Sequence, residues 1–414
     1  MAIGVRLFFI GAIFVCACVA WAVLGSTIFA RTYESDSLLK ERVESNWGAE
    51  HKQEPPAAIC RKKVPRKVET VEGGKKIVRT EEEIVTTVLP LESSNIEVRI
   101  ALQPRQKGLL WYSTYAVTFE GNYLFRNTSD QDTVEFAIKY PSARAIYDDL
   151  TLSVGDQPLM LASEDKSVKA LAKINPGSMA TLKLAYRSQG MNRWGYGFGG
   201  DVAQVRGFNL RMLTDFKEID FPENTLSPSE KHESATGWQL AWSYKNMVSG
   251  IDIAIAMPEK QQPGPLAGRI SYFAPVSLLF FFVVIFVLTA IRGVDLHPVN
   301  YAFLAAAFFS FHLLLAYVVD HVSILAAFAL SSAVSVLLVV TYLRLVVGWR
   351  FALREAALSQ VIYLVMFSYA FLLKGFTGLA VTIVAIVTLF VVMQLTGRMR
   401  WNDMLTGRPR TGTA

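Results

Sequence analysis

Long stretches without a charged residue constrain this chain more than any other feature of its sequence. Residues 7–30 form an uncharged run of 24 residues, which as a helix would be about 36 Å long. Five further apolar stretches occupy the C-terminal third, at 270–291, 301–319, 322–342, 357–373 and 376–395. Each can cross a hydrocarbon core of ~30 Å, although 357–373 is near the lower limit. Because backbone polar groups in lipid must be satisfied within their own segment, the sequence predicts six transmembrane helices.

The composition and the distribution of charge exclude several classes of protein. Hydrophobic residues make up 52% and charged residues 18%, whereas soluble domains carry about 25% charged residues. An ordinary cytosolic enzyme and a disordered chain are therefore excluded. The net charge is +6, but residues 31–269 hold 31 basic and 31 acidic residues, so the remaining 10 basic and 4 acidic residues account for all of it. Without a basic surface on the polar region, we expect no nucleic-acid partner.

Arginine positions orient the predicted helices. With the N-terminus in the cytoplasm, nine arginines fall in short cytoplasmic segments and only Lys374 falls in a short outer turn. These arginines are Arg6, Arg292, Arg344, Arg350, Arg354, Arg398, Arg400, Arg408 and Arg410. The positive-inside rule then places both termini in the cytoplasm of a multi-pass inner membrane protein.

This orientation divides the chain into four predicted parts. Residues 1–30 are an N-terminal transmembrane anchor, 31–269 a periplasmic domain, 270–397 a five-span bundle and 398–414 a basic cytoplasmic tail. The first apolar run exceeds the 7–15 residues of a signal peptide, which favours a retained anchor, although cleavage near Ser26 stays open. The lipid bilayer is the first expected partner.

The predicted periplasmic domain has the alternation and turn signals of a mainly-β fold. Residues 64–72 and 75–88 flank two glycines, which is typical of a hairpin. Tyr115, Val117 and Phe119 alternate with smaller or polar residues, as in a half-buried strand. We also expect strand 168–174 to pair with strand 181–186 across residues 175–177. The spacing of the turns predicts a sandwich or a partly open barrel, joined to the second span by a tether at 261–268.

Cysteine and histidine usage indicates no metal site and no cofactor. Cys16 and Cys18 lie in the first apolar run, where each acts as a small hydrophobic residue, and Cys60 is alone in the polar region. No pair of cysteines has the spacing of a structural zinc site.

Motifs in the C-terminal third resemble a known family. They are Leu296-His297-Pro298 with Tyr301, then Asp320-His321 where the family usually has Glu-His, and the basic ending at 395–401 that closes with tryptophan. On these residues the chain resembles the inner membrane protein CreD family, also called the colicin-tolerance family, as a divergent member. The likeness covers about 270–402 and the order of one span, a large insert and a cluster of spans.

The resemblance implies a modest set of functional expectations. The family is linked to envelope stress signalling through a two-component system and to tolerance of colicins and β-lactams. It supplies no catalytic residues, so His297, Pro298, Tyr301 and His321 transfer as motif positions without assigned chemistry.

Three groups of polar residues in or beside the predicted helices have competing interpretations. His312 lies within a span, where an ionisable residue suggests function, but a neutral imidazole can equally hydrogen-bond a neighbouring helix, which we favour. Asp320-His321 could relay protons, yet a polar turn between helices explains both residues and is the favoured interpretation. Ser331, Ser332 and Ser335 could suggest a serine nucleophile, but small residues more often allow close helix packing.

One stretch of the predicted β domain stands out. In residues 194–200, Trp194, Tyr196 and Phe198 alternate with glycines. The rings could form a flat platform for a glycan or a lipid headgroup. They could also fill the core while the glycines allow a bend, which is the interpretation we favour.

The sequence therefore favours an inner membrane protein that acts in envelope integrity or stress tolerance through its periplasmic domain. A periplasmic protein or another envelope component is the expected partner, and we expect no enzymatic activity. The alternative is a transporter or lipid-handling protein, which the lack of visible inverted repeats or broken helices disfavours. A membrane enzyme is the third interpretation.

Overall fold

The computed structural model describes residues 3–72, 75–108, 110–142, 146–164, 166–199, 203–373 and 375–397. The chain divides into two compact units. The helical unit comprises Met1–Leu38, Gly108–Leu110 and Gln261–Ala414, and the β unit comprises Leu39–Lys107 and Trp111–Lys260. The two glycines at 73 and 74, Lys374, Gly200 and the basic tail 398–414 lie outside the described residues.

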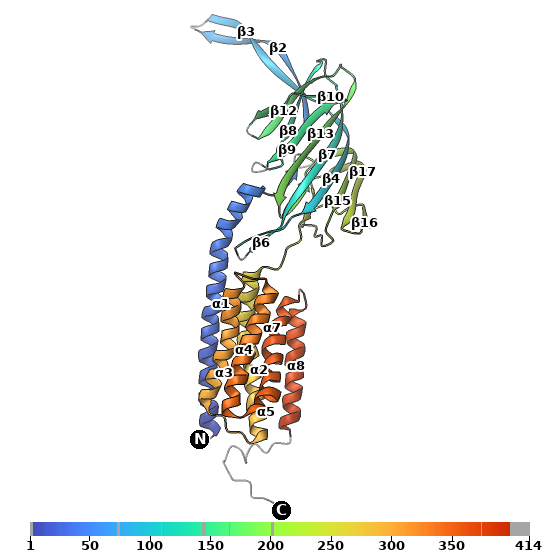
Figure 1. Ribbon diagram of the computed structural model, residues 1–414. Coiled ribbons are helices and arrows are strands. Elements are labelled where there is room, and N and C mark those ends of the chain that lie inside the picture. The colour runs from blue at the N-terminus through green and yellow to red at the C-terminus, as the bar shows by residue number, and fades with distance from the viewer. Residues whose placement is uncertain are drawn as a thin grey trace, which may run out of the picture. The chain divides into compact units, whose positions relative to one another are not determined.

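Among the described residues, six helices are long and apolar enough to cross a membrane, as predicted. They are α1 (Ile3–Trp47), α2 (Pro263–Arg292), α3 (Pro298–Val318), α4 (Ile324–Val346), the segment Trp349–Leu372 and α8 (Thr377–Thr396). In Figure 1 the first part of α1 runs alongside α2, α3, α4 and α8, with α1 and α8 on opposite sides of the bundle. Together with the β unit, they confirm the predicted class of a helical membrane protein with a large mainly-β insert.

The start of one of these helices differs from its predicted range. α1 continues past the apolar run to Trp47, as the helical pattern of residues 31–46 predicts, and its last residues, from Leu39, belong to the β unit. The predicted tether 261–268 is wrong for most of its length, because α2 begins at Pro263 with proline in its first turn. Proline is tolerated there since the first amide groups of a helix have no partner within the helix.

The fifth span is irregular rather than a single α-helix. It runs as α5 (Trp349–Phe351), η1 (Ala352–Ala356), α6 (Ala357–Gln360), η2 (Val361–Met366), α7 (Phe367–Tyr369) and η3 (Ala370–Leu372). η1 and η2 are π-helical and η3 is a 3-10 turn. It starts eight residues before the predicted start at residue 357, so the span is longer than the lower limit for crossing the membrane.

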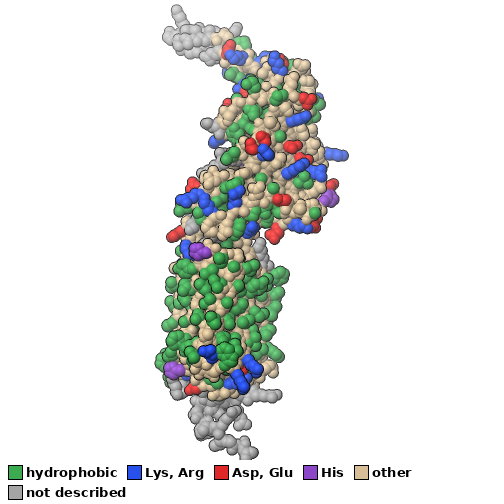
Figure 2. Space-filling model, viewed as in Figure 1, with side chains coloured by type: hydrophobic (Ala, Val, Ile, Leu, Met, Phe, Trp, Pro, Cys, Tyr) green, Lys and Arg blue, Asp and Glu red, His purple; other side chains and the backbone are tan. Residues whose placement is uncertain are grey.

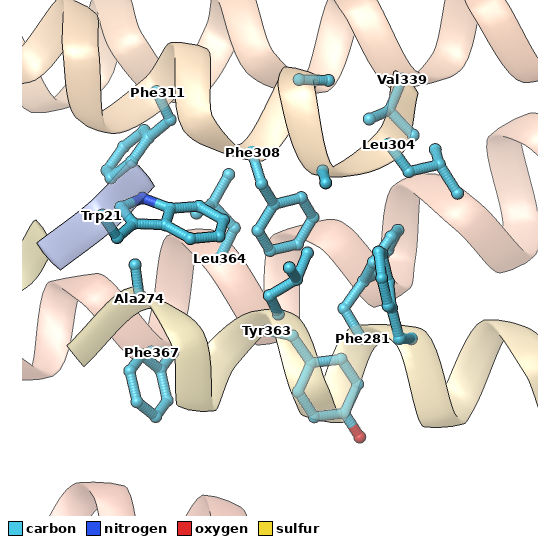
Figure 3. Close-up of a cluster of buried hydrophobic side chains, with 14 of the residues drawn as sticks. Trp21, Ala274, Phe281, Leu304, Phe308, Phe311, Val339, Tyr363, Leu364 and Phe367 are labelled. Atoms are coloured by element: carbon cyan, nitrogen blue, oxygen red, sulfur yellow. The ribbon is translucent and has the colours of Figure 1, made fainter. Parts of the chain in front are cut away.

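The core of the helical unit is dominated by aromatic and aliphatic side chains from α1 to the fifth span, and partly buried valines of α8 pack against it. Trp21 of α1 is fully buried among Ala274, Phe308 and Phe311 (Figure 3). The ring centroids of Phe281 and Phe308 lie 4.5 Å apart. At about 25 cal/mol per Å² of buried apolar surface, such rings contribute a large part of the packing energy.

The largest sheet of the β unit has eight strands in the order β10-β9-β13-β7-β4-β15-β17-β16. Its strands are β4 (Leu91–Leu102), β7 (Thr114–Arg126), β9 (Tyr147–Val154), β10 (Gln157–Pro158), β13 (Met179–Met191), β15 (Ala203–Thr214), β16 (Glu230–Glu233) and β17 (Trp238–Ser249). All neighbours are antiparallel except β4 and β15. The predicted alternation is present, because Tyr115, Val117 and Phe119 are buried and the residues between them are not.

The second sheet has five strands in the order β11-β12-β8-β2-β3. These are β2 (Ala57–Glu72), β3 (Lys75–Val88), β8 (Thr133–Lys139), β11 (Ala162–Glu164) and β12 (Ser167–Lys173). Two smaller sheets consist of β1 (His51–Gln53), β14 (Arg193–Tyr196) and β18 (Ile253–Ala256), and of β5 (Arg105–Lys107) and β6 (Leu110–Tyr112). The predicted hairpin is confirmed by the pairing of Glu72 with Lys75.

The expected pairing of strands 168–174 and 181–186 is wrong. β12 pairs with β8 and β11, whereas β13 pairs with β7 and β9 in the other sheet. The turn at 175–177 therefore connects two sheets. Both sheets contribute to one apolar core, in which the ring centroids of Phe125 and Phe136 lie 5.5 Å apart. A local turn signal shows that the chain reverses but not which strand it joins.

The surfaces of the two units differ in composition. Figure 2 shows hydrophobic side chains covering the visible side of the helical unit, with basic residues near one end of it. On the β unit, acidic and basic side chains alternate with neutral ones (Figure 2). The helical unit exposes large hydrophobic residues such as Leu389 and Phe390, each 61% exposed, which water would disfavour and lipid accepts.

Candidate functional site

The motif residues His297, Pro298 and Tyr301 form the start of α3. His297 is the N-cap residue, and its Nδ1 accepts a hydrogen bond from the Val299 N–H at 3.3 Å. Pro298 follows in the first turn, where its fixed φ suits a helix start. Tyr301, one turn further, is fully buried with its ring edge-on to Phe282 at 5.2 Å. The motif thus has a local structural role as a helix start and a packing anchor.

Asp295, just before the Leu296-His297-Pro298 motif, forms an ion pair with the first helix. Arg6 of α1 donates from Nη1 to Asp295 Oδ1 at 2.9 Å, and its guanidinium lies 5.7 Å from the Phe286 ring centroid. The Arg6 side chain is only 13% exposed, whereas that of Asp295 is 87% exposed. Since Asp295 is exposed, the ion pair adds little stability, and it orients α1 against the start of α3.

Asp320 and His321 follow the other end of α3, and the structure does not bring them together as a proton relay. Both Asp320 carboxylate oxygens approach Arg31 of α1 at 3.4 Å. The His321 N–H donates to Val318 O at 3.0 Å, and its side chain is exposed. Among the described residues, no hydrogen bond joins the two side chains. The carboxylate therefore meets an arginine from another helix rather than a histidine beside it.

Arg31 is the residue at this end that the sequence reasoning missed. Its Nη2 donates to Ala316 O at 3.0 Å, and its guanidinium lies 5.4 Å from the Tyr317 ring centroid. A cation at the C-terminal end of a helix is stabilised by the exposed carbonyl groups and by the helix dipole. The available signal was its position, because Arg31 directly follows the first uncharged run.

His312 is buried in the middle of α3. Its Nδ1 lies 3.0 Å from Phe308 O, one turn back in the same helix, so the expected hydrogen bond to a neighbouring helix is wrong. The ring contacts Trp21 edge-on at 5.5 Å and Phe311 at 4.8 Å between centroids. Its Nε2 has no partner among the described residues. This nitrogen is a polar atom held in an apolar surrounding.

A hydrogen-bonded chain joins three spans near the middle of the helical unit. Gln360 Nε2 donates to Ser335 Oγ at 2.8 Å, and Ser335 Oγ donates to Ala307 O at 2.6 Å. Gln360 and Ser335 are fully buried. Within the described chain, Gln360 Oε1 and Ser331 Oγ have no partner. The sequence reasoning missed Gln360, although it is the one glutamine in the apolar run 357–373.

These contacts argue against a serine nucleophile. Ser335 donates its proton to a backbone carbonyl and accepts from an amide, and Ser332 Oγ donates to Phe328 O at 2.7 Å. A nucleophile needs a base to take its proton, and a carbonyl oxygen cannot do so. The serines instead allow close packing of α4, as the sequence favours.

Gln360 lies between the two π-helical turns η1 and η2. π-Turns inside helices frequently occur at functional sites, because they change which face a residue presents. The carbonyl of Tyr363, in η2, accepts a hydrogen bond from Ser277 Oγ of α2. The Tyr363 hydroxyl accepts from Thr388 Oγ1 of α8 at 3.1 Å, so this span is bonded to α2 and α8 as well as to α4.

In the β unit, the alternating aromatic stretch does not form an exposed platform. Trp194 and Tyr196 are buried in β14, at 0% and 1% exposure. Phe198 is half-buried and contacts Phe208 at 5.1 Å between ring centroids. The rings belong to the core, and Gly195 lies where an added Cβ would be 3.2 Å from Ile253 O, so glycine lets the strands approach.

A second buried group of the β unit was not foreseen. His51 of β1 is 1% exposed. Its ring stacks on that of Tyr147, with 6.4 Å between centroids, and contacts the Tyr115 ring edge-on, with 5.8 Å between centroids. Burial lowers the pKa of His51 to about 4 and raises the pKa of Tyr115. We call His51, Tyr115, Tyr140, Tyr147 and Tyr186 the tyrosine cluster. Their separation along the chain hid it from sequence reasoning.

Two hydroxyl groups of the tyrosine cluster are hydrogen-bonded within the protein. The Tyr115 hydroxyl donates to Arg193 O at 2.7 Å, and the Tyr186 hydroxyl donates to Gln53 Oε1 at 2.8 Å. In the part of the chain that the structure describes, no group of three or more His, Cys, Asp or Glu side chains could hold a metal ion.

Comparisons with known proteins point to one family. Residues 243–402 match the family model described as inner membrane protein CreD. No curated protein matches the chain. Solved structures with some likeness include a two-domain M1 zinc metallopeptidase bound to L-arginine, at 11% identity over 41% of this chain and 42% of that one, with a TM-score of 0.24. An M1 zinc metallopeptidase from Deinococcus radiodurans has 9% identity over 76% of this chain and 92% of that one, at the same TM-score. The chain thus spans less than half of the first of these structures. TM-scores this low do not indicate a shared fold.

Proposed function

We propose that this chain, whose residues 243–402 match the inner membrane protein CreD family, acts in the integrity or stress tolerance of the bacterial envelope. The active part is the β unit, which contacts a periplasmic protein or another envelope component. The bundle holds this unit at the membrane, and the protein has no enzymatic activity of its own.

The observation that carries this proposal is the contrast between one lipid-type surface and one water-type surface in the same chain. The helices expose leucine, valine and phenylalanine, and the β unit exposes balanced charge. The excess of nine arginines over Lys374 in the short connecting segments supports a β unit outside the cytoplasm by the positive-inside rule. A charge-balanced β unit suits a protein or envelope partner better than a nucleic acid.

Sidedness is tested by cysteine labelling in intact cells. Met160 is 93% exposed in the β unit, and Arg350 is exposed in α5, at the start of the fifth span. We expect a membrane-impermeant maleimide to label Met160→Cys from outside and to label Arg350→Cys only after lysis. The wild type is the blank, since Cys60 is buried and Cys16 and Cys18 lie in α1. Labelling of Arg350→Cys alone in intact cells would show that the orientation is the opposite of the proposed one.

The envelope role is tested by deletion and complementation. Cells without the protein are challenged with colicins, β-lactams and detergent, and the full-length chain is returned on a plasmid. We expect greater sensitivity or a shifted tolerance that the wild-type chain restores. Unchanged growth under every challenge would contradict the proposal.

Transport or lipid handling is the second candidate, and the buried polar chain favours it. Gln360 lies between two π-turns with Oε1 unpartnered among the described residues, and broken helices often mark substrate sites in transporters. If the bundle is only an anchor, the double variant Gln360→Leu/Ser335→Ala restores growth as well as the wild type does. Loss of complementation with normal membrane levels would favour transport.

A further inference from the structure

Strand β3 leaves one long side without a neighbouring strand. It is the last strand in the order β11-β12-β8-β2-β3, among the residues that the structure describes. β8 pairs with β2 only at Ala57, Ala58 and Ile59, so most of the β2–β3 ribbon extends beyond the sheet (Figure 1). An open strand edge presents unpaired N–H and C=O groups to any chain that can adopt the same geometry.

The C-terminal end of β3 has the composition of a pairing strand. Residues 84–88 are Ile84, Val85, Thr86, Thr87 and Val88, which are all β-branched and uncharged. Ile84, Val85 and Val88 are 59%, 46% and 70% exposed, and both threonines are exposed. β-Branched residues favour strands because they pack well on a pleated surface. This open edge therefore combines free backbone groups with side chains suited to a sheet.

Backbone hydrogen bonds identify which groups point away from β2. The Leu89 N–H donates to Ala58 O at 2.8 Å, which makes these opposed residues a hydrogen-bonded pair. In an antiparallel ladder such pairs alternate with pairs whose backbone groups point outward. Thr87 opposite Cys60 and Val85 opposite Lys62 therefore face β2. Ile84, Thr86 and Val88 direct their N–H and C=O groups to the open edge.

We infer that the β3 edges of two copies of this chain pair antiparallel about a twofold axis at Thr86. In that register Thr86 lies opposite Thr86 of the second copy, and Ile84 lies opposite Val88. Each outward N–H then meets an outward C=O. The five uncharged residues of each copy face only one another.

Charge disfavours a register centred on the acidic residues, whereas the axis at Thr86 lies at the centre of the uncharged run 84–88. Glu82 and Glu83 of β3 are bonded within their own ribbon, to Lys63 at 2.9 Å and Arg66 at 3.2 Å. With the axis at Thr86, Glu83 faces Leu89 of the second copy. An axis at Glu82 would place two carboxylates directly opposite each other, which is destabilising. Because the contact is isologous, it closes at two copies and does not propagate into a fibre.

Cross-linking in native membranes tests the register. Directly opposed residues in a hydrogen-bonded pair have Cα atoms about 5.5 Å apart, within the range that a disulfide spans. We expect Thr86→Cys to form a covalent dimer at least about tenfold more efficiently than Val85→Cys, whose two copies would be about 8 Å apart. The wild type again serves as the blank. Equal cross-linking of both variants, or cross-linking of Thr86→Cys only after solubilisation, would overturn the inference.

A pair of proline substitutions separates pairing from folding. Proline removes one backbone N–H, so Thr86→Pro removes an outward donor and leaves the β2–β3 ladder complete. We expect Thr86→Pro to be monomeric by light scattering in detergent, with unfolding like that of the wild type. Thr87→Pro removes a donor that faces β2 and should lower the stability of the β unit. A monomeric wild type, or a Thr86→Pro variant that stays dimeric, would contradict the inference. Neither result depends on the envelope phenotype.

Discussion

The helical unit and the β unit differ in which kinds of side chain they bury and which they expose. The β unit buries its largest aromatic rings, such as Phe119 and Trp242, and exposes charge. In α8, by contrast, Thr388 is the one buried residue, while Leu389 and Phe390 face outward. The same residue type is therefore a core residue in one unit and a surface residue in the other. Exposure must be interpreted against the solvent that each unit meets.

Removing a buried ring from the β unit should have the largest effect. Phe119 is fully buried and stacks on Tyr186 at 5.0 Å. We expect Phe119→Ala to lower the free energy of unfolding of the β unit by about 3–5 kcal/mol, from lost burial and the cavity left behind. Denaturant titration of the purified protein measures the change. Phe390→Ala on α8 is the control, and an equal loss there would remove the distinction between the units.

Adding a charged residue to the surface should disturb the helical unit more than the β unit. Phe390 is 61% exposed on α8 and Met179 is 51% exposed on the β unit. A lysine facing lipid at mid-span costs about 2.5–3.5 kcal/mol in insertion, whereas surface substitutions in water usually change stability by less than about 0.5 kcal/mol. We therefore expect Phe390→Lys, and not Met179→Lys, to reduce the membrane-integrated fraction in an insertion assay. Equal insertion would argue that α8 does not face lipid.

Acid should weaken the β unit through His51. Burial lowers the pKa of His51 to about 4 from 6.5, so below pH 6.5 the unfolded chain binds a proton that the folded chain does not. Stability from this group is complete above pH 6.5 and falls as the pH decreases toward 4, by up to about 3 kcal/mol. Unfolding of the wild type and of His51→Phe at several pH values measures this. A pH dependence unchanged in the variant would refute the role of His51.

The smallest effect is expected for the polar chain in the bundle. Gln360 and Ser335 share a 2.8 Å hydrogen bond between two spans. Such bonds contribute about 0.6 kcal/mol on average in membranes, because the separated helices also find partners. A double-mutant cycle with Gln360→Leu and Ser335→Ala should give a coupling of that size. A coupling above about 2 kcal/mol would show that the bond is unusually strong for a membrane interior.

Local signals predicted some of the candidate site and not the rest. The third apolar run predicted a span at 301–319, close to the observed α3, and the polar pair after Val319 follows the end of that helix. The partners of these residues come from distant segments, as Arg31 does for Asp320 and Arg6 for Asp295. No local pattern indicates which helix lies beside another.

The sequence by itself determined the six apolar helices, the mainly-β insert and its charge balance, because run length, alternation and charge are local properties of the chain. Tertiary structure decided which strands pair, as the turn at 175–177 shows by joining β12 and β13 in different sheets. It also decided that His51 and Tyr147, far apart in the chain, share one buried cluster. Pairing and burial depend on contacts between distant segments, and the free energy of those contacts is defined only once the whole unit has packed.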